Sequence, residues 1–447
     1  MSTNKANGKA ESTRRSFLRA GTVAITGLGV AGRARASEAK EALALFGGPK
    51  TVTYPADRHA AITKWPRYGE AEKNVLHEVI DSGKFYQELP RLEEAWKDYT
   101  KVPYVKAHCN GTSALTSMFF ALDLPPGSEI LAPSCTFFAT ILPMRFFGYV
   151  PIFIDIDPRT ACFDLEDAKR KLTARTKALI PMHSWGLPCE MDHISAFARE
   201  KGLILLEDAA QAHGASMQGK AMGAWGAMGI YSFQLSKVVP AIEGGMGMYH
   251  AREHYERAAA FGHYEDPPKF PKDSPYRRYE ETGFGQKYRM HPLAAVLARK
   301  QLESLDERNA LVASQVRKLN DRLLQLPGLS EPRCRPDQKR AYYHANMLFL
   351  DEAKAGFSRT ALVKALRAEG VRASVWDYPQ QHKFKIYAEA KWWHHPPQVP
   401  EVLPGSTQVN GTHVFVPLLY AEEPELAEQY VKAFEKAWAH RAELAKV

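Results

Sequence analysis

The stretch "LILLEDAAQA", residues 203–212, joins a continuous apolar run to a carboxylate at its end. A short apolar run of this kind is typical of a strand that is buried on both faces of a sheet. Similar runs, "SEILAPS", "PIFIDIDP" and "KALIPMHS", alternate with segments of helical spacing along the preceding chain. This alternation predicts an α/β fold with a mostly parallel sheet that helices cover on both faces.

Three regions can be told apart along the 447 residues. Residues 1–36 read as a basic export segment, and residues 37–305 as an N-terminal arm followed by a large domain. Residues 291–326 have the spacing of one long helix, which leads into a smaller α+β domain over residues 306–447. Within the large domain, before this helix, lies a polar, proline-rich loop, residues 265–282, which is a candidate for a contact between subunits.

The basic character of the chain is concentrated at its start. Residues 1–36 contain seven lysines and arginines and one acidic residue, Glu11. Most of the formal charge of +9 therefore lies in this segment, and the charge of residues 37–447 predicts no nucleic-acid partner. Arg14-Arg15, a mildly apolar stretch and the small residues around Arg35 resemble a twin-arginine signal. We expect export to the periplasm by the twin-arginine machinery. The alternative is an unused basic arm on a cytoplasmic protein.

The cysteines indicate neither a disulfide framework nor a metal site. There are five, an odd number, and no two of them form a C-x-x-C pair. We therefore expect no metal. The two N-G-T sequons, at Asn110 and Asn410, are interpreted as chance matches.

Two residues near strand ends could carry chemistry. Asp208 ends the run quoted above, with the small Ala210 on the same side of the strand, and ligands bind at the carboxyl ends of parallel strands. Lys237 follows the short strand "GIYSF" in "YSFQLSKVVPAIEGG", residues 231–245. An aspartate that pairs with a protonated ring nitrogen and a lysine that forms an imine are what pyridoxal phosphate requires. Each residue alone also fits a structural role, as a strand cap or a solvated charge.

Two further stretches strengthen this interpretation. "HCNGTSALTSMFF" places Gly111, Thr112 and Ser113 at the start of a helix, where backbone N–H groups and hydroxyls form a phosphate cradle. A plain helix cap is the alternative. In "APSCTFFAT", Phe137 and Phe138 follow a strand end. One of them is a candidate to stack on a pyridine ring, although a core phenylalanine fits the same pattern.

Taken in order, these motifs resemble the DegT/DnrJ/StrS family of pyridoxal-phosphate-dependent aminotransferases, the sugar aminotransferases. "EDAAQAHGA", the glycines of "GKAMGAWGAMGIYSF", "SKVVPAIEGGMG" and "GFGQKYRMHPLAAVLARKQL" carry the resemblance, which covers roughly Leu43 to the C-terminus. It implies the fold of the fold type I pyridoxal-phosphate transferases, with a large and a small domain. It also implies a homodimer with its sites at the subunit interface.

The resemblance implies a role for each matching residue. Lys237 matches the lysine that forms the internal aldimine with the cofactor and shuttles the proton, and Asp208 matches the acid that keeps the pyridine nitrogen protonated. The residues that match the remaining cofactor contacts are Gln211 at the ring hydroxyl, Phe137 as the stacking aromatic, and Thr112, Ser113 and Ser232 at the phosphate.

One position departs from the family pattern. Lys287 stands where the family usually has an asparagine that reaches the phosphate in the neighbouring site. Lysine binds phosphate as a point charge, so Lys287 of the partner subunit is expected to keep this contact.

The resulting expectation is an aminotransferase that moves an amino group from glutamate or glutamine to a keto-sugar or keto-cyclitol. A dehydratase branch of the fold has histidine in place of the imine-forming lysine, and Lys237 argues against that branch. A non-catalytic or regulatory member of the fold is the alternative from another class. Nucleotide-activated sugars are cytoplasmic, so an exported enzyme would not meet an acceptor of that kind. His344 and His382 lie in segments that could line the acceptor pocket, although ordinary surface or core roles fit them equally.

Overall fold

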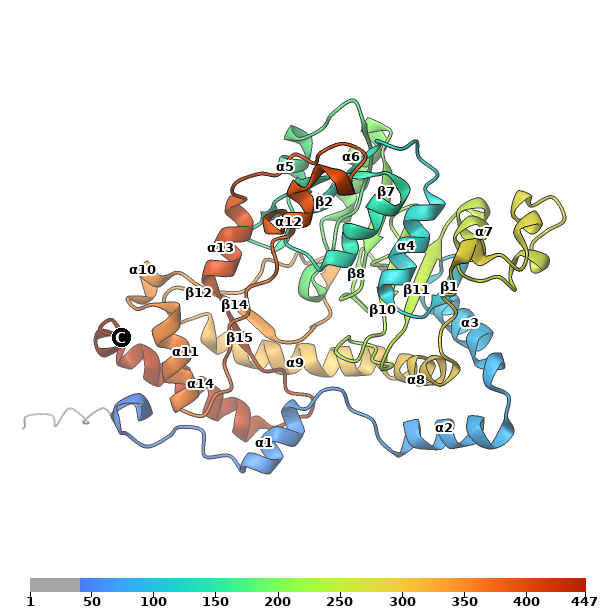
Figure 1. Ribbon diagram of the computed structural model, residues 1–447. Helices are drawn as coiled ribbons and strands as arrows, with labels where there is room; N and C mark the ends of the chain where they lie inside the picture. Colours follow the sequence, from blue (N-terminus) through green and yellow to red (C-terminus); the bar gives the residue numbers. More distant parts are fainter. Residues whose placement is uncertain (1–40) are drawn as a thin grey trace, which may run out of the picture. The chain divides into compact units, whose positions relative to one another are not determined.

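A seven-stranded sheet lies at the centre of residues 41–447, the part of the chain that the computed structural model describes (Figure 1). Its strand order is β1-β11-β10-β7-β6-β2-β3. Strands β10 to β3 run parallel, whereas β11 is antiparallel to both β10 and β1. The strands are β1 (Tyr104–His108), β2 (Glu129–Pro133), β3 (Val150–Ile154), β6 (Thr176–Leu179), β7 (Ile204–Asp208), β10 (Met228–Ser232) and β11 (Gly245–Tyr249). The mostly parallel sheet predicted from the sequence is confirmed.

Alternate residues along the strands of the sheet belong to two separate hydrophobic cores. Leu131 and Leu205 belong to one core, while their neighbours Ile130 and Leu206 belong to the other. Because successive side chains of a strand point to opposite faces, this division means that both faces of the sheet are covered. Apolar burial on two faces is the reason that these strands read as continuous apolar runs.

Helices and short strands surround the sheet in the first part of the chain. Helix α4 packs on β10 and β11, and α3 packs on β1. The helices are α1 (Ala56–Thr63), α2 (Glu70–Ser82), α3 (Glu88–Thr100), α4 (Gly111–Ala121), α5 (Leu165–Arg170), α6 (Met191–Lys201), α7 (Arg252–Ala260) and α8 (Pro292–Glu303). The short strands are β4 (Ile156–Asp157), β5 (Cys162–Phe163), β8 (Ser216–Met217) and β9 (Lys220–Ala221).

A second, smaller sheet of three antiparallel strands lies in the C-terminal part, in the order β12-β14-β15. It has its own core, to which helices α9, α11 and α14 contribute. The strands are β12 (Leu329–Ser330), β14 (Asn346–Leu350) and β15 (His413–Val416), and β13 (Gln338–Lys339) pairs with β8 instead. The helices are α9 (Leu305–Leu323), α10 (Glu352–Ala355), α11 (Arg359–Ala368), α12 (Lys385–Ala388), α13 (Pro404–Thr412), α14 (Pro424–Ala439) and α15 (Arg441–Leu444).

Two sequence expectations need correction. The long helix predicted over residues 291–326 is two helices, α8 and α9, because Ser304 leaves the helical conformation at φ −105° and ψ 8°. Between β2 and β3 lies the 3-10 helix η4 (Leu142–Phe147). The N-terminal arm was assigned to the large domain, yet its buried residues Leu43, Val52 and Tyr54 pack into the C-terminal core.

Two further expectations concern the 265–282 loop and the N-terminal segment. The 265–282 loop contains the 3-10 helices η6 (Pro267–Lys269) and η7 (Pro275–Tyr279). The segment expected to be a twin-arginine signal, residues 1–36, lies outside the described residues. Within residues 41–447, no helix is long and apolar enough to span a membrane.

Candidate functional site

The candidate site lies where the carboxyl ends of β7 and β10 meet the start of α4. Parallel pairing of β7 and β10 sets Asp208 beside Ile230, two residues before Ser232 at the strand end. On the other side of β10, Gly245 of β11 pairs with Ser232. Gly245 also packs closely on the Asn110 backbone, since a Cβ added at Gly245 would lie only 2.5 Å from the Asn110 carbonyl oxygen. Topology therefore brings the predicted acid and the predicted phosphate cradle to one edge of the sheet.

The start of α4 depends on a glycine. A Cβ at Gly111 would lie 2.8 Å from the Cβ of Ser232, so only glycine lets the helix start approach the end of β10 this closely. Thr112 is partly exposed, and within the described residues its hydroxyl makes no hydrogen bond. The first turn of a helix also has backbone N–H groups that no carbonyl of the helix accepts. Gly111, Thr112 and Ser232 thus form a cradle of backbone and hydroxyl donors that suits a phosphate.

Ser113 differs from its neighbours. Its hydroxyl donates to the Asn110 carbonyl over 2.9 Å, and its backbone N–H donates to Asn110 Oδ1 over 2.8 Å. The Asn110 N–H in turn donates to Ser113 Oγ over 3.1 Å, which completes a capping box. The Ser113 hydroxyl is therefore engaged in the helix cap, as in the alternative that the sequence left open.

Asp208 is buried at the end of β7 with 3% of its surface exposed. The Thr140 hydroxyl donates to its Oδ2 atom over 2.7 Å, and the Ala210 N–H donates to Oδ1 over 3.0 Å. Thr140 is itself 2.7 Å from the Thr136 hydroxyl. These donors fix the orientation of the carboxylate.

Gln211 connects the large domain to the C-terminal part. Its Oε1 atom accepts the N–H of Trp185 over 2.7 Å, and its Nε2 atom donates to the Tyr378 hydroxyl over 2.8 Å. Burial raises the pKa of Tyr378 well above its usual range, so this hydroxyl stays protonated at neutral pH. The residue predicted to face the ring hydroxyl therefore joins Trp185 of the large domain to Tyr378 of the C-terminal part.

Phe137 is an exposed aromatic residue, with 52% of its surface accessible and its ring centroid 4.2 Å from that of Phe138. Both rings follow β2, at the same edge of the sheet as Asp208. The alternative of a core phenylalanine is excluded by this exposure, and a free ring face is available for stacking.

Lys237 lies in the loop between β10 and β11 rather than directly at a strand end. Its Nζ atom lies 4.6 Å from the centroid of the Tyr343 ring. Its backbone is fixed by two hydrogen bonds, one to the Gln234 carbonyl over 2.8 Å and one from Trp65 Nε1 over 3.1 Å. Within residues 41–447 no carboxylate pairs with this amine, which leaves it available as a nucleophile.

The two predicted histidines have different environments. His382 is buried, its Nδ1 atom lies 2.7 Å from the Ser134 hydroxyl, and burial lowers its pKa, so it is a core residue. His344 is exposed, has a left-handed φ of 69°, and lies beside Trp185 and Trp376 with ring centroids 6.0 and 5.9 Å away. Only His344 is near Lys237.

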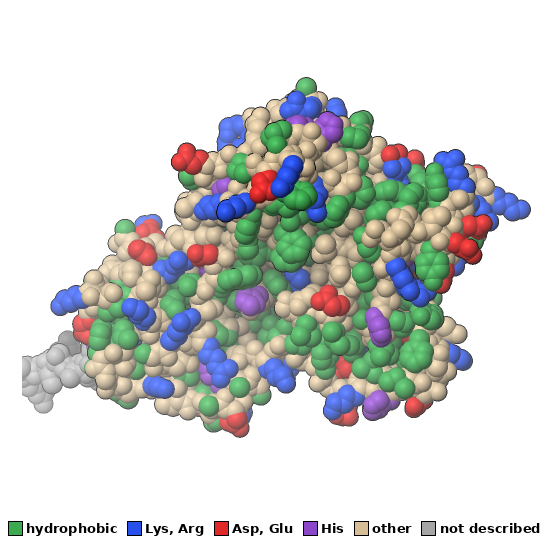
Figure 2. Space-filling view, viewed as in Figure 1, with side chains coloured by type: hydrophobic (Ala, Val, Ile, Leu, Met, Phe, Trp, Pro, Cys, Tyr) green, Lys and Arg blue, Asp and Glu red, His purple; other side chains and the backbone are tan. Residues whose placement is uncertain are grey.

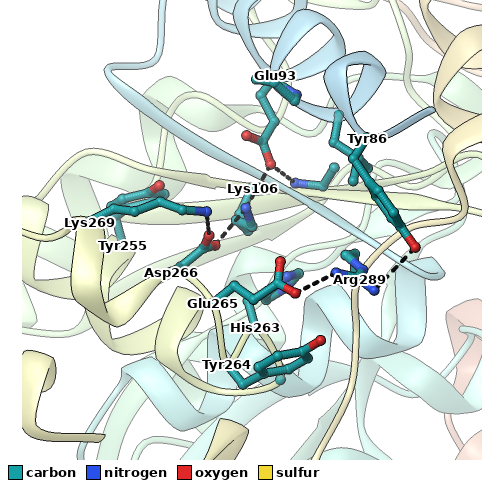
Figure 3. A pocket seen from close by; sticks show the side chains of 14 residues that line it. Tyr86, Glu93, Lys106, Tyr255, His263, Tyr264, Glu265, Asp266, Lys269 and Arg289 are labelled. Atoms are coloured by element: carbon teal, nitrogen blue, oxygen red, sulfur yellow. Dashed lines mark hydrogen bonds and ion pairs between the residues drawn. The ribbon is translucent and has the colours of Figure 1, made fainter. Parts of the chain in front are cut away.

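Lys287 is exposed and lines an open cavity of about 580 Å³ with Cys109, Ile242 and Met290. Cys109 lies two residues before Gly111 of the phosphate cradle, and Ile242 lies in the same β10–β11 loop as Lys237. A second cavity, of about 340 Å³, lies beside β1 (Figure 3). There the Lys106 ammonium lies between Glu93 and Asp266, at 3.0 and 2.7 Å, and contacts none of the predicted site residues.

Sequence reasoning missed several residues of the site: Trp185, Tyr343, Trp376, Tyr378 and Thr140. Tyr343, Trp376 and Tyr378 come from segments far from the motifs and read as core residues. Trp185 and Thr140 had a signal, since Trp185 directly follows the run "KALIPMHS" and Thr140 closes the stretch "APSCTFFAT".

Comparison with known proteins agrees with this geometry. A profile of the DegT/DnrJ/EryC1/StrS aminotransferase family matches residues 66–434. The chain belongs to this family. Members of the family are pyridoxal-phosphate-dependent aminotransferases of the fold type I class, so the predicted fold class is confirmed.

Individual relatives are similar at moderate identity. The GDP-perosamine synthase of Escherichia coli O157:H7 is 31% identical over 53% of this chain and 64% of its own length. The L-glutamine:2-deoxy-scyllo-inosose aminotransferase of Streptoalloteichus tenebrarius is 31% identical over 73% of this chain and 80% of its own. The solved aminotransferase of Psychrobacter cryohalolentis superposes with a TM-score of 0.76 at 26% identity, over 85% of this chain and 99% of that one.

The described residues fit the family cofactor. The start of α4 at Gly111, with its backbone N–H groups and the nearby hydroxyls, suits the phosphate. The buried Asp208 carboxylate suits a protonated ring nitrogen, the exposed ring of Phe137 suits the flat ring, and the free Lys237 amine suits the aldehyde carbon.

Proposed function

We propose that this chain is a pyridoxal-phosphate-dependent aminotransferase that moves an amino group from glutamine or glutamate to a keto-sugar or keto-cyclitol. The observation that carries the proposal is the Lys237 amine, which has no carboxylate partner within the described residues and lies in the loop that follows β10. The side chain is half-buried, and its Nζ atom is held beside the site, 4.6 Å from the centroid of the Tyr343 ring.

Each residue of the site has a part in this chemistry. Asp208 Oδ2, oriented by Thr140, accepts the ring N–H of the cofactor. The bound cofactor supplies an electron sink for the electron pair that is released when the Cα–H bond of the donor breaks. Lys237 Nζ would take up that proton and give it back, while Thr112 and Ser232 would hold the phosphate.

The names of the relatives support the substrate class. One is a GDP-perosamine synthase, and another acts with L-glutamine on 2-deoxy-scyllo-inosose. For this chain we propose the same two kinds of acceptor, a nucleotide-linked keto-sugar or a free keto-cyclitol, with glutamine or glutamate as the donor. Because two substrates react in turn at one site, the enzyme follows ping-pong kinetics.

We further propose a homodimer in which Lys287 of the partner subunit completes the phosphate site. The exposed Lys287 and the 58% exposed Ile242 line the open cavity beside the cradle. Hydrophobic side chains also cover much of the middle of the face in Figure 2, as expected for a surface that a second copy covers. Sedimentation analysis of the wild type tests the homodimer, and the cofactor affinity of Lys287→Ala tests the phosphate contact. A monomeric wild type, or an unchanged cofactor affinity in the variant, contradicts the proposal.

Export remains a separate proposal. A twin-arginine signal would carry the folded protein with its cofactor already bound. The test is the position of the full chain after expression in cells with and without a functional twin-arginine system. A cytoplasmic location in both strains would contradict it.

The absorption spectrum of the loaded protein tests the enzyme proposal. Wild type is expected to have a yellow band that glutamine or glutamate bleaches, and Lys237→Ala is expected to lose both the band and the bleaching. Lys177→Ala removes an exposed lysine of β6 and is expected to behave as wild type. A wild type with no band, even after pyridoxal phosphate is added, would leave a non-catalytic member of the fold.

A further inference from the structure

The rings beside Lys237 form a continuous aromatic cluster. The Tyr343 ring lies under the Lys237 ammonium and stacks on Trp185 with centroids 5.9 Å apart. Trp185 meets Trp376 edge to face at 5.8 Å, and Trp376 meets Tyr378 at 5.4 Å. The cluster therefore begins at the reactive amine and ends at Trp376.

Two members of this cluster have unusual backbones. Trp185 has φ 55° and ψ 24°, and His344 has φ 69°, both in the left-handed region that non-glycine residues rarely adopt. Such conformations cost about 1–3 kcal/mol each and gather at functional sites. The Gln211 bond to the Trp185 N–H over 2.7 Å fixes one of them. Two strained residues with rings 6.0 Å apart indicate that this cluster is set for a ligand and not only for packing.

Trp376 is the exposed end of the cluster. Of its surface 47% is accessible, whereas Trp185 and Tyr378 are buried at 5% and 7%. Its backbone does not move freely, because its N–H donates to His413 Nε2 over 3.1 Å. Two positions earlier, Ser374 exchanges two backbone hydrogen bonds with Phe415, and two positions later the Tyr378 N–H donates to Asn410 Oδ1. A rigid segment thus holds an exposed indole that Trp185 and Tyr343 connect to the Lys237 amine.

The far end of this segment lies against the loop that carries Phe137. Cys135 and Gln380 form an antiparallel bridge, and Gln381 donates through its N–H to the Ser134 carbonyl over 2.8 Å and through Nε2 to the Thr136 carbonyl over 2.7 Å. The segment that presents Trp376 is therefore fixed both to β15 and to the cofactor side of the site. A ring bound on Trp376 would be held at a fixed place relative to Phe137 and Lys237.

We infer that Trp376 is the platform for the acceptor, and that the acceptor is a neutral, polyhydroxylated six-membered ring that lies on the indole face with His344 at its hydroxyl groups. The inference rests on the proposed aminotransferase function. The C–H groups of such a ring carry partial positive charge, and the face of an indole is negative. A flat apolar wall with a few polar groups is the usual way in which proteins orient an uncharged ligand.

The two half-reactions separate this role from a structural one. Trp376→Ala is expected to lower kcat/KM for the acceptor by about tenfold or more, mainly through KM, and to slow bleaching by glutamine much less than it slows transfer to the acceptor. Trp376→Phe keeps an aromatic face and is expected to recover most of the loss. Trp392→Ala is the matched control, since Trp392 is also exposed, at 42%, but lies over Arg145 and away from Lys237.

The acceptor probes are a free keto-cyclitol and a GDP-linked keto-sugar, which share the ring chemistry and differ in the nucleotide. Loss with both probes identifies the ring as the group that Trp376 binds, and the probe with the higher wild-type kcat/KM identifies the source. Calorimetric titration of the same proteins with the aminated cyclitol gives a readout that does not depend on turnover, and its affinity should fall about tenfold in Trp376→Ala.

An acceptor kcat/KM in Trp376→Ala within twofold of wild type would overturn the inference. A wild type that bleaches with glutamine but transfers to neither probe would also overturn it, because the site then does not take a neutral ring. A wild type that does not bleach at all would instead overturn the proposed function.

Discussion

The Thr140 hydroxyl donates a hydrogen bond to Asp208 Oδ2 over 2.7 Å, and this contact joins the loop after β2 to the end of β7. Both residues are buried, so the orientation of the carboxylate is set by the protein and not by water. A hydrogen bond to a charged group contributes about 1.5–3 kcal/mol, and most of that is lost when one partner is removed.

Thr140→Val is therefore expected to lower kcat about tenfold and to weaken cofactor binding, while Asp208→Asn lowers kcat at least about a hundredfold. Stopped-flow bleaching by glutamine measures the loss of rate, and equilibrium dialysis measures the loss of cofactor affinity. Thr412→Val is the control, because its exposed hydroxyl bonds only to the Gln408 carbonyl over 2.9 Å. A Thr140→Val enzyme as fast as this control would mean that Asp208 needs no positioning by Thr140.

A glycine at position 111 is required by the approach of α4 to the end of β10. In Gly111→Ala the new Cβ would lie 2.8 Å from the Cβ of Ser232, so one of the two elements must shift. The phosphate site is then distorted, and we expect the affinity for pyridoxal phosphate to fall about tenfold or more while the fold persists.

Gly411→Ala is the matched control for this variant. It lies in α13, where a Cβ would meet nothing within 4 Å, so cofactor affinity should stay unchanged and stability should rise by about 0.5–1 kcal/mol. Fluorescence titration of both apoproteins with pyridoxal phosphate makes the comparison. Equal affinities would show that the cradle does not depend on the close approach of Gly111 to Ser232.

Most of the parallel sheet could be predicted from the sequence, because strands buried on both faces appear as apolar runs. Strands β1 and β11 were missed for a physical reason. The sequence "GMGMY" of β11 is rich in glycine, and "YVKAH" of β1 contains Lys106, so neither has the pattern of a buried strand. Lys106 is tolerated there only because Glu93 and Asp266 pair with it, and these partners are remote in sequence.

The site divides in the same way. Asp208, Gly111 and Lys237 could be singled out from the sequence because the predicted cofactor needs these residue types at strand and helix ends. Ser113 was ambiguous, since a helix cap and a phosphate ligand need the same hydroxyl. Trp376 could not be found, because nothing local distinguishes a platform residue from a packed one until the backbone bond to His413 is seen.

Acid should destabilise the protein through His108. This residue is fully buried beside His263, with 3.2 Å between His108 Nδ1 and His263 Nε2, and burial together with Lys106 lowers its pKa to about 3. Its unfolded pKa is about 6.5. Above that value both states are neutral. As the pH falls from about 6.5 toward 3, only the unfolded state takes up a proton, and the free energy of unfolding falls by about 1.4 kcal/mol per pH unit from this group.

Urea unfolding of the apoprotein at several pH values between 7 and 5 measures this slope. His108→Gln should reduce it by about one proton, and the exposed control His394→Gln should leave it unchanged. Identical slopes in all three proteins would mean that His108 is protonated in the folded state.

The cavity in Figure 3 has one buried and one exposed ion pair on the same aspartate, so their contributions to the free energy of unfolding can be compared. Asp266 binds two lysines, Lys106 at 2.7 Å and Lys269 at 2.9 Å. The Lys106 side chain is only 12% exposed and the Lys269 side chain is 68% exposed. Glu93 and Asp266 raise the pKa of Lys106 against the opposing effect of burial, so this ammonium stays charged.

Lys106→Met should lower the free energy of unfolding by about 3–5 kcal/mol, because it leaves Glu93 without a cation and Asp266 with only the exposed Lys269. Lys269→Met removes a lysine from the same aspartate at the surface, and should cost no more than about 1 kcal/mol. Adding Asp266→Asn to Lys106→Met should recover part of the loss, since it removes one of the unpaired charges. Differential scanning calorimetry of the four proteins decides the matter. Equal losses from the two lysine variants would mean that water reaches Lys106 as freely as it reaches Lys269.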